Sequence, residues 1–275
     1  MKLIADSGST KTDWCLMDET GILLRMTTQG INPIHQTQDG IKEILRILQS
    51  KLFKQPTTIC FYGSGVTPSQ REPMCQLLRE VFPGVGEVTA ESDLLGAARS
   101  LCQQKEGLAC ILGTGANSCL YDGQDIVQNT PALGYILGDE GSGAVLGIRF
   151  LNALYKGALP ESLRQDFENE MGLGVSDVIN RVYRQPQANR WLASLSVFIH
   201  AHLDMPEVRE IVIDNFRCFI RRNVLPYGRK DLPLDAVGSI AWHYRGQLSE
   251  AAETEGFVLG TVLQSPMEGL VAYHR

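Results

Sequence analysis

A pattern of strand, small-residue turn and strand occurs twice in this chain. The first copy, residues 3–21, runs from the apolar stretch LIA through the turn DSGSTK to a second strand and the turn DETG. The second copy, residues 110–123, runs from CIL through GTGA to another strand and a turn at Asp122–Gly123. Chance similarity of two short stretches is the alternative. Because the elements repeat in the same order, we predict a duplicated fold whose halves each open with a β-hairpin.

Between the two copies, strand patterns alternate with helix patterns. Apolar residues recur at helical spacing over 38–54, and strand-like stretches stand on both sides of that segment. The predicted order is strands 2–5, 12–17 and 22–26, helix 38–54, strand 57–62, helix 68–81, strand 86–90 and helix 93–103. This order predicts a mixed sheet flanked by helices.

After the second copy, the chain is mostly helical from Gly141 to Asn223, which we interpret as an insertion into the second half. The predicted elements are helices 144–155, 163–171, 175–183, 188–200 and 206–223, strand 234–237, helix 241–254, strand 257–259 and a final helix. Ser265 as N-cap and Glu268 form a capping box on that final helix. At about 150 residues per domain, 275 residues correspond to about two domains, which we place at 1–108 and 109–275.

The charge of the chain argues against nucleic-acid and membrane partners. Lys and Arg number 25 against 31 Asp and Glu, the net charge is −6, and no stretch concentrates basic residues. No apolar run approaches the ~18 residues of a membrane span, and Asp6 interrupts the apolar opening too early for a signal peptide. We therefore expect a cytoplasmic protein.

The seven cysteines and five histidines show no spacing typical of a metal site. The cysteine count is odd, no C-x-x-C pair occurs, and Cys15, Cys60 and Cys110 lie in apolar, strand-like stretches. Reduced thiols in the core are therefore expected rather than a disulfide or cluster framework. The histidines are interpreted as structural or surface residues.

The two turns rich in Gly, Ser and Thr are candidates for binding phosphate, because such turns point backbone N–H groups and hydroxyls at an anion. Neither contains the P-loop pattern, and a plain β-turn is the alternative for each. The candidate ligands are Ser7, Gly8, Ser9, Thr10 and Lys11 in the first turn and Gly113, Thr114 and Gly115 in the second. Asp6, at the end of a strand, could hold Mg²⁺ through water.

Three segments, taken in order, resemble the N-acetylglucosamine kinase family, which lies within the BadF/BadG/BcrA/BcrD-type ATPases of the actin, sugar-kinase and heat-shock-chaperone superfamily. They are residues 6–13 (DSGSTKTD), 112–118 (LGTGANS) and 138–142 (GDEGS), similar to the phosphate-1, phosphate-2 and sugar-loop segments. The resemblance spans nearly the whole chain. It implies an α/β, two-domain, actin-like ATPase (ribonuclease H-like) fold, with a duplicated five-stranded mixed sheet, flanking helices and a helical insertion in the second domain. It also implies ATP and Mg²⁺ as cofactors and a sugar as acceptor.

Asp93 lies between a predicted strand and a predicted helix, and the resemblance implies that it is the catalytic base. Phosphoryl transfer to an alcohol needs a carboxylate that accepts the hydroxyl proton. We expect the helix N-terminus to favour its ionised form. An ordinary N-cap aspartate is the alternative interpretation. The turn Gly63–Gly65 follows the neighbouring strand and is a further candidate for a phosphate or sugar contact.

The resemblance implies three sugar ligands, Asn32, Thr114 and Asp139. Asp139 stands just before a predicted helix, so helix capping is the alternative interpretation of that residue. Where family members carry Gly-Trp before a glycine, this chain has residues 132–134 (ALG). That departure leaves the substituent at position 2 of the sugar open.

A predicted strand, a turn at Gly238 and Ser239, and a helix follow one another over residues 235–241. This segment resembles the adenosine motif of the family, because a Gly-Ser turn lets a base or ribose lie close to the backbone. A common strand-to-helix junction is the alternative.

Together the residues and the resemblance imply ATP-dependent phosphorylation of an amino sugar, N-acetylglucosamine to its 6-phosphate. One alternative is an ATPase that activates a dehydratase or reductase through an iron–sulfur cluster at a dimer interface, which would need thiolates at that interface. The other is a nucleotide or sugar sensor without turnover. The resemblance also allows a homodimer.

Overall fold

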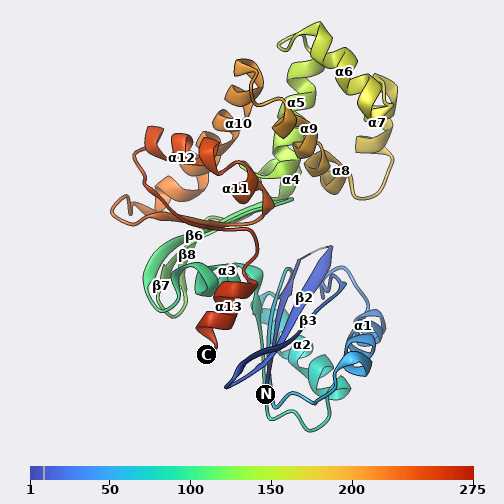
Figure 1. The fold of residues 1–275 in the computed structure, drawn as a ribbon, viewed down its shortest axis with the longest axis vertical. Coiled ribbons are helices and arrows are strands. Elements are labelled where there is room, and N and C mark those ends of the chain that lie inside the picture. The colour runs from blue at the N-terminus through green and yellow to red at the C-terminus, as the bar shows by residue number, and fades with distance from the viewer. Residues whose placement is uncertain (9) are drawn as a thin grey trace. The chain divides into compact units, whose positions relative to one another are not determined.

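The computed structural model describes residues 1–8 and 10–275, which form two compact units. The first unit comprises residues 1–105, 123–125 and 266–275, and the second comprises 106–122 and 126–265. Each unit is built on one five-stranded sheet (Figure 1). Residues 266–275, which the sequence assigned to the second domain, pack with the first unit.

The first unit orders its strands β3-β2-β1-β4-β5. Its elements are β1 (Lys2–Ser7), β2 (Lys11–Asp18), β3 (Gly21–Gln29), α1 (Gln38–Lys51), β4 (Thr58–Gly63), α2 (Pro68–Val81), β5 (Glu87–Ser92), α3 (Asp93–Cys102) and α13 (Met267–Tyr273). Strands β1, β2 and β3 are joined as antiparallel hairpins, whereas β1, β4 and β5 are parallel. This is the mixed sheet that the sequence predicts.

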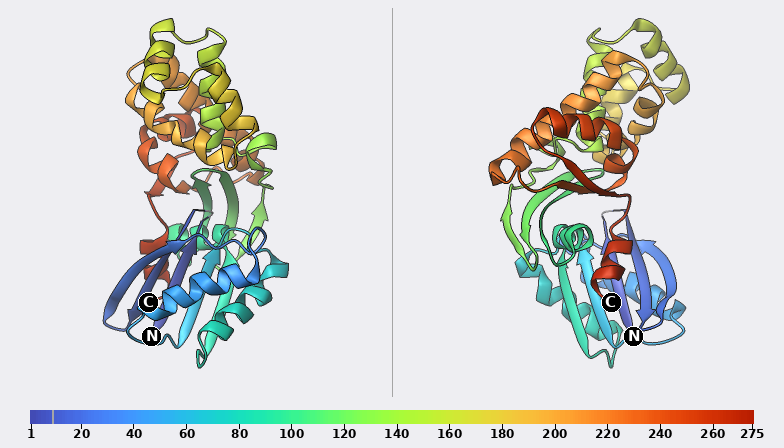
Figure 2. Two further views of the ribbon diagram at one scale, coloured as in Figure 1. Left: turned by 90° about the vertical axis from the view of Figure 1, so that its right-hand side faces the viewer. Right: turned by 60° about the vertical axis from the view of Figure 1, so that its left-hand side comes forward.

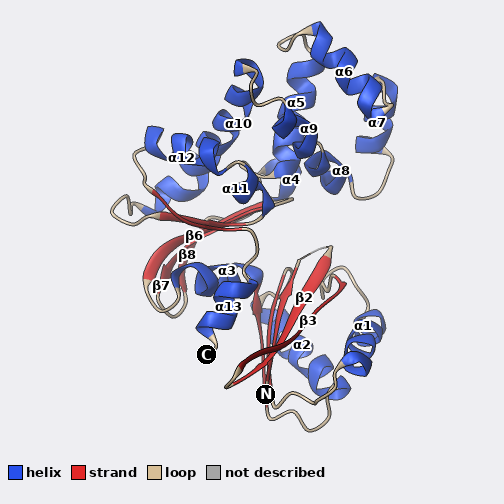
Figure 3. Cartoon of the chain, viewed as in Figure 1, coloured by secondary structure: helices blue, strands red, loops and turns tan. Residues whose placement is uncertain are grey.

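Both faces of this sheet carry helices (Figure 3), because successive side chains of a strand point to opposite faces. Leu3 belongs to a core shared with α1 and α2. Ile4, the next residue of β1, belongs to a separate core with Met267 and Leu270 of α13. Because of this alternation, β1 offers a second apolar face on which the C-terminal helix α13 packs beside α3.

The parallel strands of the first sheet end level with one another. Ser7 of β1 pairs with Gly63 of β4, and Gly63 pairs with Ser92 of β5. The segments after these strands, including Asp93 directly after β5, therefore leave the sheet at one edge. Open α/β sheets bind ligands at the carboxyl ends of their strands. We call this edge the carboxyl edge of the first sheet.

The second unit orders its strands β10-β9-β6-β7-β8, the same topology with β6 in the place of β1. Its strands are β6 (Glu106–Leu112), β7 (Ala116–Asp122), β8 (Ile126–Asn129), β9 (Leu234–Val237) and β10 (Leu259–Leu263). Its helices are α4 (Gly134–Leu137), α5 (Gly143–Tyr155), α6 (Glu161–Met171), α7 (Val175–Tyr183), α8 (Ala188–Ser194), α9 (Ser196–Ala201), α10 (Pro206–Phe219), α11 (Ser239–His243) and α12 (Arg245–Thr254), with a π-helical turn (Ile220–Val224) and a 3₁₀ turn (Leu225–Tyr227) after α10. The predicted duplication and the helical insertion are confirmed.

The helices of the second unit stack on one face of its sheet (Figure 2). Leu108, Cys110 and Leu112 of β6 point to this face and pack in one core with Phe150 of α5 and Phe216 of α10. Among the helices of residues 1–8 and 10–275, none combines the length and the apolar character needed to cross a bilayer.

Some predicted helix boundaries are wrong. The helix predicted over 188–200 is two helices, α8 and α9, and that over 241–254 is likewise two, α11 and α12. The helix predicted over 206–223 passes into the π-helical turn. The Tyr244 hydroxyl, at the α11–α12 junction, donates a hydrogen bond to the carbonyl of Ser196, at the start of α9. Apolar periodicity does not record such tertiary contacts.

One strand prediction near the C-terminus is also wrong in its bounds. The strand predicted over 257–259 is β10, which begins at Leu259 and ends at Leu263. Within it the N–H of Thr261 donates to the Asp235 carboxylate, and the register with β9 shifts. The final helix begins at Met267 with Pro266 in the N-cap position, one residue after the predicted cap Ser265. The capping box of Ser265 and Glu268 stays a prediction.

Candidate functional site

Asp93 is the first residue of α3, and two hydrogen bonds hold its carboxylate. The Ser64 hydroxyl donates to Asp93 Oδ2 at 2.5 Å, and the Leu94 N–H donates to Oδ1 at 2.9 Å. The N-cap of α3 is Ser92, whose hydroxyl accepts the N–H of Leu95. The interpretation of Asp93 as an ordinary N-cap is therefore wrong, and its carboxylate is oriented by the turn that follows β4.

The protonation of Asp93 is governed by burial. Burial raises the pKa of Asp93, and the hydrogen bonds from Ser64 and Leu94 offset only part of that rise. The helix N-terminus was expected to favour the ionised form, but burial acts in the opposite direction and raises the pKa of Asp93, because desolvation penalises the charged form. A carboxylate with a raised pKa is a better proton acceptor than an ordinary one, as a general base requires.

Asp6 lies on β1 opposite Asp13 of β2, close to the same carboxyl edge. Burial, followed by the charges of Asp93 and Asp13, raises the pKa of Asp6 to about 7, against a lowering effect of Lys11. Carboxylates gathered in this way favour a divalent cation. No group of three or more His, Cys, Asp or Glu in the described part of the chain could hold a metal by itself. A Mg²⁺ at Asp6 would therefore need water or phosphate oxygens as its other ligands.

The hydroxyl of Ser7 is fully buried and engaged within the protein. It accepts the N–H of Ile31, donates to the Ile31 carbonyl at 2.9 Å and lies 2.7 Å from the Thr12 hydroxyl. Through these bonds Ser7 joins the hairpin of β1 and β2 to the segment that follows β3, so this side chain stabilises the turn.

The other described residues of the first turn are closer to solvent. The Gly8 N–H donates to the Lys11 carbonyl at 3.0 Å, and Thr10 is exposed. Lys11 Nζ lies 2.6 Å from Asp13 Oδ2. Ser9 lies outside the described residues. A ligand phosphate would compete with Asp13 for this lysine.

Asn32 packs directly against the turn that holds Asp93. Its Oδ1 accepts the N–H of Ile34 at 3.0 Å. Gly65 has φ +82°, and a Cβ atom there would lie 2.3 Å from Asn32 Oδ1. Because Ser64 is the neighbour of Gly65, the turn contacts both the predicted sugar ligand and the predicted base. The first unit thus brings Asp6, Asn32 and Asp93 together at its carboxyl edge.

The second glycine-rich turn packs on the amino end of α5. The Gly113 N–H donates to the Gly115 carbonyl at 3.0 Å. The N–H groups of Gly143 and Ala144 donate to the carbonyls of Gly113 and Thr114, at 2.8 and 3.2 Å. These bonds fix the turn on the amino end of α5, and they occupy N–H groups with which a helix start would otherwise bind an anion.

Asp139 contacts this same turn. Its backbone has φ +55°, and a Cβ atom on Gly115 would lie 3.0 Å from Asp139 Oδ2. Burial raises the pKa of Asp139, while N–H groups of Ala116 and Gly134 bond its carboxylate and lower it in part. The N-cap of α5 is Ser142, so the interpretation of Asp139 as a helix cap is wrong.

Gly238 lies against the end of β6, where the second turn begins. It has φ +127°, and a Cβ atom there would lie 2.3 Å from the Leu112 carbonyl oxygen. Ser239 follows as the exposed first residue of α11. A residue without a side chain is therefore required at this junction because of the packing against β6, and the close approach of a ligand to this backbone stays a prediction.

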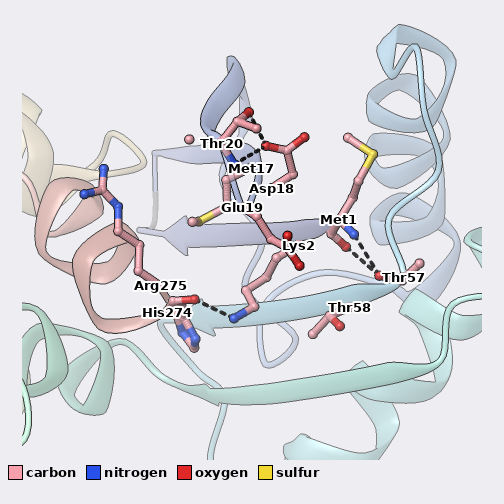
Figure 4. Close-up of a pocket in the computed structure, with 11 residues that line it drawn as sticks. Met1, Lys2, Met17, Asp18, Glu19, Thr20, Thr57, Thr58, His274 and Arg275 are labelled. Carbon is pink, nitrogen blue, oxygen red and sulfur yellow. Dashed lines mark hydrogen bonds between the residues drawn. The ribbon is translucent and has the colours of Figure 1, made fainter.

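A cavity of about 650 Å³ opens at the opposite edge of the first sheet (Figure 4). The amino ends of β1 and β4, the turn after β2 and the last residues of the chain line it. Here Lys2 Nζ donates to the His274 carbonyl at 2.5 Å, and the Met1 amino group donates to the Thr57 hydroxyl at 2.9 Å. None of the predicted site residues lines this cavity.

Sequence reasoning missed two functional candidates. Ser64 had a signal, since it stands between two glycines after a strand, but its bond to Asp93 was not foreseen. Arg222 pairs with Glu140 at 2.6 Å, but no sequence signal pointed to this pair, because the two residues are 82 positions apart.

The seven cysteines all lie within the described residues, and all are buried except the half-buried Cys218. This burial does not favour the alternative of an ATPase that carries an iron–sulfur cluster.

Comparisons with known proteins found close and distant relatives, although no protein-family model matches the chain. A crystal structure from Porphyromonas gingivalis is 49% identical, with a TM-score of 0.95 over 100% of this chain and 98% of that one. One from Chromobacterium violaceum is 18% identical, with a TM-score of 0.75 over 100% and 98%, and shows the same fold. Both are described as putative N-acetylglucosamine kinases. A curated N-acetylmuramic acid/N-acetylglucosamine kinase from Clostridium acetobutylicum is 21% identical over 209 residues, 71% of this chain and 68% of the relative.

Proposed function

This chain belongs to the family of N-acetylglucosamine kinases, and we propose that it transfers the γ-phosphoryl group of ATP to the 6-hydroxyl of N-acetylglucosamine. The observation that carries the proposal is the arrangement of Asp93 at the carboxyl edge of the first sheet. There its carboxylate is hydrogen-bonded by Ser64, beside a turn that contacts Asn32 and within electrostatic reach of Asp6.

In the proposed reaction Asp93 accepts the proton of the sugar hydroxyl. The hydroxyl oxygen forms a bond to the γ-phosphorus while the bond from that phosphorus to the β,γ-bridging oxygen breaks, and ADP leaves. Ser64 holds Oδ2 of Asp93, and the raised pKa of the carboxyl favours proton uptake. Asn32 and Asp139 are proposed to accept or donate hydrogen bonds to sugar hydroxyls, together with Thr114.

Asp6 is the proposed residue for Mg²⁺. The raised pKa of Asp6 fits this role, because a buried carboxyl beside other carboxylates is stabilised as an anion by a cation. When bound, Mg²⁺ would supply positive charge to the phosphates of ATP. The two glycine-rich turns, with Gly238 and Ser239, are proposed to bind the nucleotide. That both turns bind one triphosphate stays a prediction.

The test is an ATP-consumption assay with N-acetylglucosamine, N-acetylmannosamine, glucosamine and glucose, using sugar-free ATPase activity as the baseline. We expect N-acetylglucosamine to give the highest kcat/KM. The 6-deoxy analogue should inhibit without being phosphorylated, because it lacks the accepting hydroxyl. Asp93→Asn should lower kcat by about 10²–10⁴-fold, the usual contribution of a general base, while ATP binding persists.

Asp39→Asn is the matched control, because Asp39 lies in the first turn of α1, as Asp93 lies in that of α3, and was not assigned to the site. Near-normal turnover in Asp93→Asn would remove this residue from the mechanism. ATP hydrolysis that no sugar accelerates would contradict the kinase proposal and favour the ATPase alternative. ATP binding with neither reaction would favour the sensor.

The homodimer and the cytoplasmic location also stay predictions. Light scattering of the purified chain at several concentrations tests the first. Cell fractionation tests the second.

A further inference from the structure

The loop that carries Asp139 is tied to a distant part of the second unit through its next residue. The Glu140 carboxylate accepts hydrogen bonds from Arg222 Nη1 at 2.6 Å and from Asn223 Nδ2 at 3.4 Å. The Glu140 side chain is 13% exposed, whereas that of Arg222 is 70% exposed. Burial raises the pKa of Glu140, but its hydrogen bonds, including those from Arg222 and Asn223, lower it below its ordinary value.

The segment that supplies Arg222 is itself anchored. It forms the π-helical turn after α10, a rare geometry that occurs often at functional sites. The carbonyl of Asn223 accepts the hydroxyls of Ser118 at 3.1 Å and Thr130 at 2.9 Å. The turn is thus fixed to β7 and to the segment after β8. Glu140 is therefore bonded to a segment whose backbone is itself held by hydrogen bonds.

The Asp139 backbone needs such support, because an aspartate at φ +55° is in a sparsely populated region. Its carbonyl accepts the Ser142 N–H at 3.0 Å, and the Gly141 N–H donates to the fully buried Asn215 at 3.2 Å. These bonds fix the chain after Asp139, and the pair Glu140–Arg222 fixes it at the adjacent residue.

We propose that Glu140 and Arg222 are positioning residues that hold the Asp139 carboxylate in the orientation needed to bind the acceptor sugar. The proposal rests on the proposed function, in which Asp139 contacts sugar hydroxyls. Arg222 is 70% exposed, whereas Glu140 is 13% exposed, so replacing Arg222 is the milder change to stability. A denaturant titration of each variant separates a loss of stability from a loss of sugar binding.

Steady-state kinetics of Glu140→Gln, Arg222→Gln and the double variant test this proposal. We expect KM for N-acetylglucosamine to rise about tenfold in each, with kcat and KM for ATP within about twofold of the parent values. The double variant should be no worse than either single variant, because both remove the same contact. Arg222→Lys, which keeps the charge and one donor, should recover most of the loss.

Arg221→Gln is the matched control, since Arg221 lies on the same turn but pairs with Glu255. An unchanged sugar KM in Arg222→Gln, or equal losses in Arg221→Gln, overturns the proposal. Hydrogen exchange of residues 134–142 separates it from the proposed function. Faster exchange in Arg222→Gln than in Arg221→Gln supports the positioning role of Glu140 and Arg222 even if the parent protein phosphorylates no sugar. Unchanged exchange refutes that role.

Discussion

Replacing Ser64 with alanine should raise the pKa of Asp93 above its already elevated value. The Ser64 hydroxyl donates to Asp93 Oδ2 at 2.5 Å and favours the ionised carboxylate. A hydrogen bond to a charged group contributes about 1.5–3 kcal/mol, and about 1.4 kcal/mol corresponds to one pKa unit. Loss of the bond should therefore raise the pKa of Asp93 by about 1–2 units.

The assay is kcat/KM for the sugar as a function of pH, measured on the parent protein and on Ser64→Ala. A general base is active when it is ionised, so a higher pKa moves the acid limb of the profile to higher pH. We expect this limb to move up by about 1–2 units. The loss of activity should be greatest at low pH and should shrink as the pH rises past the new limb.

Ser92→Ala provides the control, because the Ser92 hydroxyl caps α3 by accepting the N–H of Leu95. Loss of this cap should cost about 1 kcal/mol of stability and leave the acid limb in place. An activity loss in Ser64→Ala that is equal at every pH would refute the argument, because it would mean that Ser64 does not act through the ionisation of Asp93.

Two further predictions concern the first unit. Gly65→Ala should raise the sugar KM about tenfold or more, because its Cβ would lie 2.3 Å from Asn32 Oδ1. Gly84→Ala is the control, since Gly84 has a similar φ of +92° and a Cβ there would have no atom within 4 Å, so KM should stay unchanged. Equal effects of the two substitutions would contradict the steric reasoning. Burial, with Lys2 and Arg99, lowers the pKa of His274 to about 4. Because the unfolded chain binds the proton more readily, stability should fall as pH drops from about 7 to about 5, by about 1–2 kcal/mol from this group. Denaturant titrations of His274→Asn should show a shallower pH dependence, and an unchanged one would contradict the assignment.

The topology could be predicted from the sequence because its signals are local. Alternating apolar residues and turn chemistry identify the hairpins at residues 2–29 and 106–129, and their repetition predicts two sheets of one design. The strand ends beside Gly63 and Asp93 were predicted within two residues for the same reason. Boundaries failed at tertiary contacts, as at the hydrogen bond from Tyr244 to Ser196 and at the hydrogen bond that Thr261 of β10 donates to the Asp235 side chain of β9.

The ionisation of the candidate base could not be predicted in the same way. From the sequence, Asp93 stands at a helix start, and the helix dipole alone favours the anion. In the structure, β5 ends beside β4, so the carboxyl meets the Ser64 turn and is buried near Asp6 of β1. Desolvation opposes the dipole, and it arises from strand register between segments far apart in the chain. The residue type is a local property of the sequence, whereas its basicity is a property of the assembled sheet edge.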